Sequence, residues 1–283
     1  MDQSDEDDVE SERCKRRRLP KRIILVRHGE SIGNVDGTAY TEIPDWKIPL
    51  TANGYEASIE TGLKISSIIG DKSAPLFFYC SPYLRTKQTL HAILQNNNEN
   101  PIAGVREEPQ LTGHNLWIIC KYAFKIYMVT EQQFGNFQCV EAVERAKKER
   151  DDYGRFYYRF PEGESGLDVY NRVTAFIATL PREWSRIPNI EDVTVIMVSH
   201  GLTLSKSKTY YQRANLPPMN YWYALTCKIV GLFLMRWFLY SVDDFERSKN
   251  PPNGAIILLD RVDDSHTPYF VLHEEGKRIC RFK

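Results

Sequence analysis

Three short apolar runs, each followed at once by polar residues, most constrain what this chain can fold into. The runs are Arg22–Val26, Pro75–Tyr79 and Val193–Val198, and none of them alternates apolar with polar residues. Runs of this length without alternation are typical of strands buried on both faces of a largely parallel sheet. Further strand-like runs lie at 255–259 and 269–272. We therefore expect a mainly parallel, mixed sheet.

Segments with helical spacing of apolar residues separate these runs. Thr51 is a candidate N-cap for a helix that reaches Ile69, and a second helical pattern covers 165–180. Ser81-Pro82 is a helix-start pattern with proline at the first position, so Arg85 should lie in the first turn. Alternating strands and helices predict an α/β fold, a three-layer α/β/α sandwich.

The first 20 residues differ in composition from the rest of the chain. Asp2–Glu12 is acidic, and a basic run follows at 13–18. Runs of like charge repel themselves and stay solvated, so we expect residues 1–20 to be a disordered charged tail and 21–283 to be one domain. The acidic start is unlike a signal peptide, and six cysteines without Cys-x-x-Cys spacing suit a reducing compartment. We expect a cytoplasmic protein, with nuclear import left open by the basic run.

Charge and hydropathy argue against two classes of partner. The chain has 37 basic and 37 acidic residues, so its overall charge gives no reason to bind nucleic acid or a membrane surface. Tyr221–Tyr240 is apolar, but Lys228 and Arg236 divide it into runs that are too short for a bilayer. We expect neither a nucleic-acid partner nor a membrane span.

The residues that follow the three strands form a set suited to phosphate chemistry. Ligands bind beyond the carboxyl ends of parallel strands, where the sequence places Arg27 with His28, Arg85, and His200. Guanidinium forks match phosphate oxygens, and a neutral imidazole can attack phosphorus through one ring nitrogen. One histidine after a strand is more often a structural residue, but two with two arginines outweigh that interpretation. The pattern predicts a phosphohistidine on His28, phosphate clamps at Arg27 and Arg85, and transition-state stabilisation by His200.

At these residues the sequence closely resembles the histidine phosphatase superfamily, the phosphoglycerate mutase-like proteins. The matching segments occur in the family's order along residues 22–201: Leu25–Glu30 with Asn34, Leu50-Thr51 with Gly54, Ser81-Pro82 with Arg85, Glu131 with Phe134-Gly135, Glu162–Ser165 and Val198–Gly201. The stretches 19–31 and 157–165 resemble the plant and fungal phosphoglycerate mutase-like subgroup.

The resemblance implies a phosphomonoester hydrolase that acts on a small-molecule phosphate ester or a phosphoprotein, without a metal or another cofactor. It implies these roles: phosphorylation on His28, proton donation by Glu131, and phosphate binding by Arg27, Asn34, Arg85 and His200. One alternative is mutase-type phosphoryl transfer, an isomerase reaction in which Lys147, Lys148, Arg155 or Arg159 would bind a phosphoglycerate carboxylate. Another is a phospho-ligand-binding protein with impaired catalysis. The oligomeric state stays open.

Two segments depart from the family pattern, at about 112–130 and 204–231. Both are aromatic-rich and interrupt otherwise continuous matches. Our hypothesis is that each is retained intronic sequence in a gene model, which sequencing of the transcript tests. If the inserts are genuine, they could displace Glu131 and the helix that follows His200, and a displacement of about 1 Å can cost roughly a hundredfold in rate.

Overall fold

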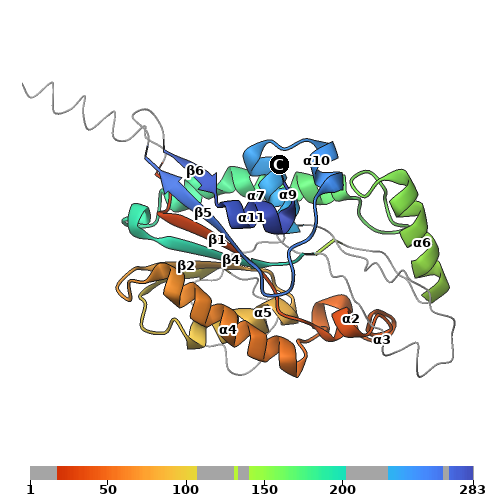
Figure 1. Ribbon diagram of the computed structural model, residues 1–283, viewed down its shortest axis with the longest axis horizontal. Helices are drawn as coiled ribbons and strands as arrows, with labels where there is room; N and C mark the ends of the chain where they lie inside the picture. The colour runs from red at the N-terminus through yellow and green to blue at the C-terminus, as the bar shows by residue number, and fades with distance from the viewer. Residues whose placement is uncertain (1–17, 107–130, 133–139, 202–228, 264–267, 283) are drawn as a thin grey trace, which may run out of the picture.

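The computed structural model describes residues 18–106, 131–132, 140–201, 229–263 and 268–282. Within these ranges a six-stranded sheet lies between two layers of helices (Figure 1). Its strands are β1 (Arg22–Arg27), β2 (Leu76–Cys80), β3 (Ile102–Arg106), β4 (Thr194–Ser199), β5 (Ile256–Val262) and β6 (Tyr269–Leu272). Their order is β3-β2-β4-β1-β5-β6. The pairs from β3 to β1 are parallel, and β5 and β6 add antiparallel pairs. The predicted α/β/α sandwich with a mainly parallel mixed sheet is confirmed.

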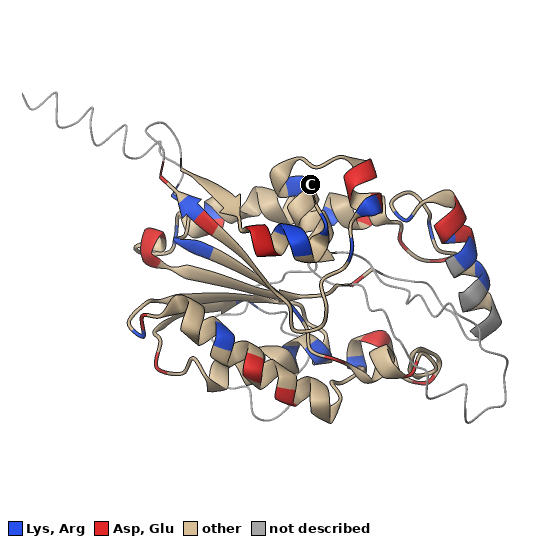
Figure 2. Ribbon diagram, in the orientation of Figure 1, with Lys and Arg blue, Asp and Glu red and all other residues tan. Residues whose placement is uncertain are grey.

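Helices cover both faces of this sheet. One face carries α4 (Ala52–Ile69) and α5 (Leu84–Gln95), and the other carries α7 (Gly166–Trp184), α9 (Ile229–Phe238) and α11 (Glu274–Cys280) (Figure 1). The remaining described helical segments are α2 (Ile32–Val35), α3 (Ala39–Glu42), η1 (Asp45–Lys47), α6 (Val140–Tyr153), η4 (Ile190–Asp192) and α10 (Val242–Arg247). Acidic and basic residues are interspersed along the outer side of α4 (Figure 2).

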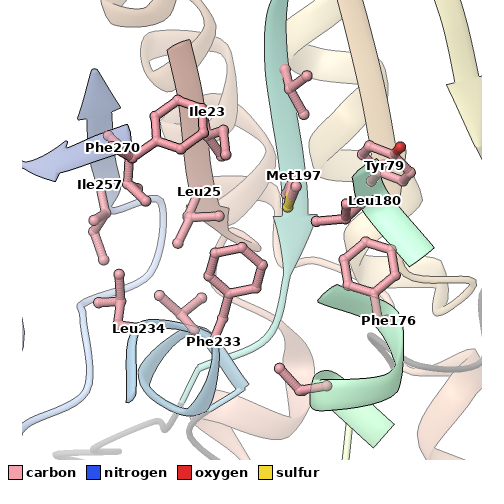
Figure 3. Packing of buried hydrophobic residues seen from close by; sticks show 14 of the residues in the cluster. Ile23, Leu25, Tyr79, Phe176, Leu180, Met197, Phe233, Leu234, Ile257 and Phe270 are labelled. Carbon is pink, nitrogen blue, oxygen red and sulfur yellow. The ribbon is translucent and has the colours of Figure 1, made fainter. Parts of the chain in front are cut away.

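The core forms because successive residues of the central strands point to opposite faces. On β1, Ile23 and Leu25 pack towards α7 and α9, whereas Ile24 and Val26 pack towards α4 and α5. Figure 3 shows the first of these clusters, in which Phe176 of α7 lies beside strand residues. Burial on both faces explains why these strands do not alternate apolar with polar residues in the sequence.

The start of α5 differs from the expectation. Thr51 caps α4 as predicted, since its Oγ1 accepts from Gly54 N at 2.9 Å. Ser81-Pro82, however, does not open α5, which begins at Leu84. Ser81 is unavailable as a cap because its Oγ lies 2.6 Å from a ring nitrogen of His200. Arg85 still falls in the first turn of α5.

Packing begins earlier along the chain than the predicted boundary at residue 20. Arg18 donates two hydrogen bonds to Glu191, at 2.7 and 2.9 Å, and Leu19 is buried in the core. Leu19 O also accepts from Arg261 Nη1 at 2.8 Å. Residues 18–20 therefore belong with the domain, because an apolar side chain and a paired guanidinium fix them. Residues 1–17 lie outside the described residues.

The two predicted inserts fall almost entirely outside the described residues. All of the first insert, 112–130, lies outside the described residues, and so do residues 204–228 of the second insert. Residues 229–231, which we placed at the end of the second insert, are instead the buried first turn of α9. Among the described helices, none is both long and apolar enough to cross a bilayer.

Candidate active site

The carboxyl ends of three neighbouring strands, β1, β4 and β2, meet at one edge of the sheet. Backbone hydrogen bonds join these ends: His28 N–H donates to Ser199 O at 2.9 Å, and Ser81 N–H donates to Val198 O at 3.0 Å. His28 directly follows β1, Ser81 follows β2 and His200 follows β4. The strand ends that the sequence singled out therefore converge.

His28 is buried, and a hydrogen bond fixes its tautomer. Its Nδ1 lies 2.6 Å from Gly29 O. Because a carbonyl oxygen can only accept, Nδ1 carries the proton and Nε2 keeps its lone pair. The ring centroids of His28 and His200 lie 5.3 Å apart, with the ring planes at 64°. His28 thus presents a fixed nitrogen lone pair beside a second imidazole.

His200 is fully buried, and polar groups approach both of its ring nitrogens. Nε2 lies 2.6 Å from Ser81 Oγ, and Nδ1 lies 3.5 Å from Glu131 Oε2. An acceptor oxygen of the Glu131 carboxyl group near Nδ1 favours the proton at that nitrogen, so Nε2 accepts from the Ser81 hydroxyl. The Tyr83 ring packs against the imidazole, with 4.9 Å between the two ring centroids. In this arrangement His200 directs an N–H towards Glu131.

Both imidazoles are held in the neutral form. Burial lowers the pKa of His28 and of His200 well below the ordinary value, and the nearby cations Arg85 and Arg27 lower it further. The Gly29 carbonyl acts on the His28 pKa in the opposite direction without reversing the shift. A neutral His28 is the form that can attack an electrophile.

The two predicted clamps, Arg27 and Arg85, are both buried at this edge. Arg27 Nη1 donates to Pro251 O at 2.7 Å. Arg85 Nη1 donates to Asp45 O at 2.7 Å and to Asp45 Oδ1 at 2.8 Å. Burial lowers the pKa of Arg27 to about 9, which leaves it cationic at pH 7. Burial is the largest single influence on the pKa of Arg85 and acts to lower it, but Asp45, Tyr40 and Glu131 together outweigh burial and raise the pKa.

Glu131 is buried beside the imidazole of His200 and the guanidinium of Arg85. Its Oε2 lies 3.5 Å from His200 Nδ1 and 3.8 Å from Arg85 Nη2. The carboxyl group therefore faces the same group of side chains as the two histidines. This placement brings Glu131 together with His28, His200, Arg27 and Arg85, and its role as a proton donor stays a prediction.

Asn34 reaches this group through a second asparagine, Asn253. Asn34 Oδ1 accepts from Asn253 Nδ2 at 2.9 Å. The same Nδ2 lies 3.1 Å from His28 O and 3.0 Å from Gly29 O. Asn34 thus lies next to the His28 turn, and its predicted contact with phosphate stays a prediction.

The site also contains a set of groups that could in principle ligate a metal. One ligand atom each from His28, Glu131 and His200 lies within 4.8 Å of the others. Two histidines and a carboxylate suit a transition metal. Here, however, Arg85 Nη2 lies 3.8 Å from the same carboxylate oxygen, and a second buried guanidinium, that of Arg27, is close by. Two cations favour an anionic phosphoryl group over a metal ion, and the expectation of no metal stays a prediction.

Sequence reasoning missed three residues that shape the site, Asp45, Tyr83 and Asn253, and it assigned Ser81 to a helix start and not to its contact with His200. Asp45 and Tyr83 both hold Arg85, the latter with its ring 4.8 Å from the guanidinium carbon. Nothing in the sequence around Asp45 or Tyr83 indicates that either residue contacts Arg85. Asn253-Gly254 is a turn dipeptide, and Gly254 has a φ of 69°. Its turn could have been predicted, but its place against His28 depends on tertiary contacts.

Ser81→Ala is expected to lower kcat/KM for phosphate esters by roughly tenfold, the worth of one buried hydrogen bond. Without the hydroxyl, His200 Nε2 loses the donor that, together with the Glu131 oxygen at Nδ1, favours the tautomer with its proton on Nδ1. The measurement is kcat/KM together with the ¹⁵N shifts of the His200 ring, which should show a mixed tautomer. Ser248→Ala removes a buried serine hydroxyl outside the site and is the matched control. An unchanged tautomer and unchanged kcat/KM would contradict the assignment.

Comparison with known proteins gives a consistent set of relatives. The model of the histidine phosphatase superfamily (branch 1) matches residues 23–113. Phosphoglycerate mutase-like protein AT74 of Arabidopsis thaliana is 38% identical over 86% of this chain, which spans 65% of that relative's length. Phosphoglycerate mutase-like protein AT74H of the same plant is 34% identical over 94% of this chain and 83% of its own length. Broad-range acid phosphatase DET1 of Saccharomyces cerevisiae is 26% identical over 88% of each chain.

Solved structures resemble the fold at lower identity. Mycobacterial hydrolase 1 superposes with a TM-score of 0.58 at 15% identity, covering 89% of this chain and 97% of its own. The α-ribazole phosphatase from Shigella flexneri gives a TM-score of 0.55 at 18% identity, covering 89% and 95%. At such identities the likeness supports the α/β/α architecture alone.

Proposed function

Since the chain belongs to the histidine phosphatase superfamily, we propose that it hydrolyses phosphomonoesters through a phosphohistidine formed on His28. The observation that carries this proposal is the fixed tautomer of His28: Nδ1 donates to Gly29 O, which leaves Nε2 as the nucleophile. The ring stands beside His200 among buried arginines, which is an anion-binding environment. A neutral imidazole as nucleophile and fixed cations are two of the parts that phosphoryl transfer to a histidine needs, and the third is an acid for the leaving alcohol.

In the first step, the His28 Nε2 lone pair forms a bond to phosphorus and the bond from phosphorus to the ester oxygen breaks. Glu131, in its carboxylic acid form, gives its proton to the departing alcohol. Arg27, Arg85 and the Nδ1–H of His200 hold the phosphoryl oxygens as charge shifts among them. Asp45 fixes the Arg85 fork by two hydrogen bonds, so little reorganisation is needed during the reaction.

In the second step, water attacks phosphorus and the bond from phosphorus to His28 Nε2 breaks. The Glu131 carboxylate accepts the proton of that water, which restores the acid form for the next cycle. The electron pair of the broken bond returns to Nε2, and orthophosphate leaves. His28 keeps its proton on Nδ1 throughout, because Gly29 O accepts from it.

The pH dependence follows from the depressed pKa of His28. Its pKa lies well below the ordinary value, so the nucleophile stays neutral as the pH falls through 6.5 and is lost only at lower pH. With 4-nitrophenyl phosphate, whose leaving group needs no proton from Glu131, we expect kcat/KM, calculated on the concentration of the substrate dianion, to stay level between about pH 7.5 and 5.5. Initial rates across this range measure it. A decline centred on the ordinary histidine pKa would contradict a neutral, buried nucleophile.

Mutase chemistry receives less support from the described residues. Of the basic residues considered for a phosphoglycerate carboxylate, Arg155 pairs with Glu246 at 3.1 Å and Arg159 pairs with Asp168 at 2.6 Å. Lys148 is exposed on α6, and the side chain of Lys147 lies outside the described residues. Because Arg155 and Arg159 are paired with carboxylates and Lys148 is exposed, these side chains do not form a site for a phosphoglycerate carboxylate. Hydrolysis needs no such site, so the described residues favour it.

The test of the proposal is capture of the intermediate. Rapid quench in alkali during turnover, followed by mass spectrometry, should place a phosphate on the peptide that contains His28, and mild acid should remove it. A chiral phosphate ester should be hydrolysed with net retention at phosphorus, because two in-line displacements each invert it. Net inversion would show direct attack by water and would end the proposal.

A further inference from the structure

The dipeptide Glu131-Gln132 is held in place by residues distant in the sequence. Both residues are buried, and they are the only described residues between 106 and 140. Glu131 Oε2 lies near His200 and Arg85, at distances of 3.5 and 3.8 Å. These two contacts involve the carboxyl group itself, so a separate set of contacts must fix the backbone that carries it.

The Glu162–Ser165 motif and α7 supply those contacts. Arg172 Nη2 donates to the backbone oxygen of Glu131 at 3.2 Å. The same guanidinium forms a two-pronged pair with Glu164, with Nε to Oε1 and Nη2 to Oε2 both at 2.9 Å. Gln132 Nε2 donates to Glu164 O at 2.6 Å. Glu131, Gln132, Glu164 and Arg172 thus form a closed ring of hydrogen bonds.

This ring is tied to the start of a long helix. Ser165 caps α7 with its side chain, and Asp168 completes the capping box by accepting from Ser165 N at 2.7 Å. Glu164 directly precedes the cap, and Arg172 lies further along the same helix. The pair is half-buried, with 20% of each side chain exposed, so it is less screened than a surface pair. The ring therefore transmits the rigidity of α7 to Glu131.

We infer that Arg172 and Glu164 are positioning residues that hold the carboxyl group of Glu131 at the leaving-group oxygen of the substrate. This inference rests on the proposed function, in which Glu131 is the proton donor. An acid must be placed within hydrogen-bond reach of the oxygen that it protonates, and small displacements are costly. Arg172 contacts the backbone oxygen of Glu131 directly, and Glu164 acts through Arg172, whose guanidinium it holds, and through the side chain of Gln132.

A misplaced acid has a kinetic signature, a dependence on the leaving group, that a general loss of structure would not produce. An alkoxide is a strong base and leaves only with a proton, whereas 4-nitrophenolate is a weak base and leaves without one. kcat/KM reports steps up to the release of the alcohol and so isolates transfer to His28. A misplaced acid should therefore slow hydrolysis of β-glycerophosphate while sparing that of 4-nitrophenyl phosphate.

The experiment measures kcat/KM for both substrates in the full chain. For Arg172→Gln, and for Glu164→Gln as the independent second variant, we expect a loss of about 10–100-fold with β-glycerophosphate and less than about threefold with 4-nitrophenyl phosphate. Glu131→Gln is the reference for complete loss of the acid, at roughly 10²–10⁴-fold with β-glycerophosphate. Arg182→Gln removes an exposed arginine from the same helix and should change neither value.

The outcomes separate this inference from the proposed function. If Glu131→Gln discriminates between the substrates but the Arg172 and Glu164 variants lose both activities equally, or neither, the positioning role is wrong and the acid assignment stands. If Glu131→Gln itself does not discriminate, Glu131 is not the acid, and the inference falls with that assignment. Discrimination in the Glu131, Arg172 and Glu164 variants supports both.

Discussion

His28→Ala is expected to lower kcat/KM for 4-nitrophenyl phosphate by at least roughly 10⁴-fold, because it removes the atom that forms the covalent bond to phosphorus. The neighbouring groups cannot replace it. His200 Nε2 is engaged by Ser81, and its Nδ1 faces Glu131. The variant should also lose the acid-labile phosphate label. Steady-state kinetics and rapid quench with the purified protein measure both effects.

A matched control separates the nucleophile from a general effect of losing an imidazole. His91 lies on the exposed side of α5, where its Nδ1 is 2.8 Å from Tyr55 Oη. His91→Ala should keep kcat/KM within about twofold, as expected for a surface substitution away from the site. Comparable rates for the wild type and His28→Ala would rule out catalysis through His28 and leave the phospho-ligand-binding alternative.

Arg85→Lys is expected to reduce kcat/KM by about 10²–10³-fold although the charge is kept. The guanidinium donates from Nη1 to Asp45 Oδ1, and its Nη2 lies 3.8 Å from Glu131 Oε2. A lysine ammonium is a single point charge and cannot serve Asp45 and a phosphoryl oxygen in this planar geometry. The loss should appear mainly in kcat, because the contact strengthens as charge shifts in the transition state.

The control for this prediction is Arg22→Lys, at the opposite end of β1. Arg22 also pairs with a carboxylate, that of Asp260, and donates to a backbone oxygen, that of Ile68, at 2.8 Å. Arg22→Lys tests how much kcat/KM falls when an arginine loses its ion pair outside the site, and it should leave kcat/KM nearly unchanged. A small effect of Arg85→Lys, equal to that of Arg22→Lys, would show that a positive charge alone suffices at position 85.

The sequence predicted the parts of the site that depend on local pattern. Apolar runs that end in His28 and His200 placed both histidines, because the carboxyl ends of parallel strands share one edge. Ser81 was misassigned, since a serine before proline signals a helix cap but cannot reveal a competing imidazole. Glu131 came from the resemblance alone, because no periodic element surrounds it in the sequence. Its anchor at Arg172 depends on a contact between residues 41 positions apart, beyond any local rule.

The antiparallel strand β5 adds a requirement that the motifs do not reveal. The turn before it supplies Pro251 O to Arg27, and Asn253 Nδ2 to the backbone oxygen of His28. A nascent chain that had left the ribosome only as far as Gly201 would carry every motif residue and still lack the turn that holds Arg27 and the His28 backbone in place. Activity should therefore emerge only after synthesis has passed this turn, and a chain truncated between α9 and β5 should be inactive although it keeps each motif.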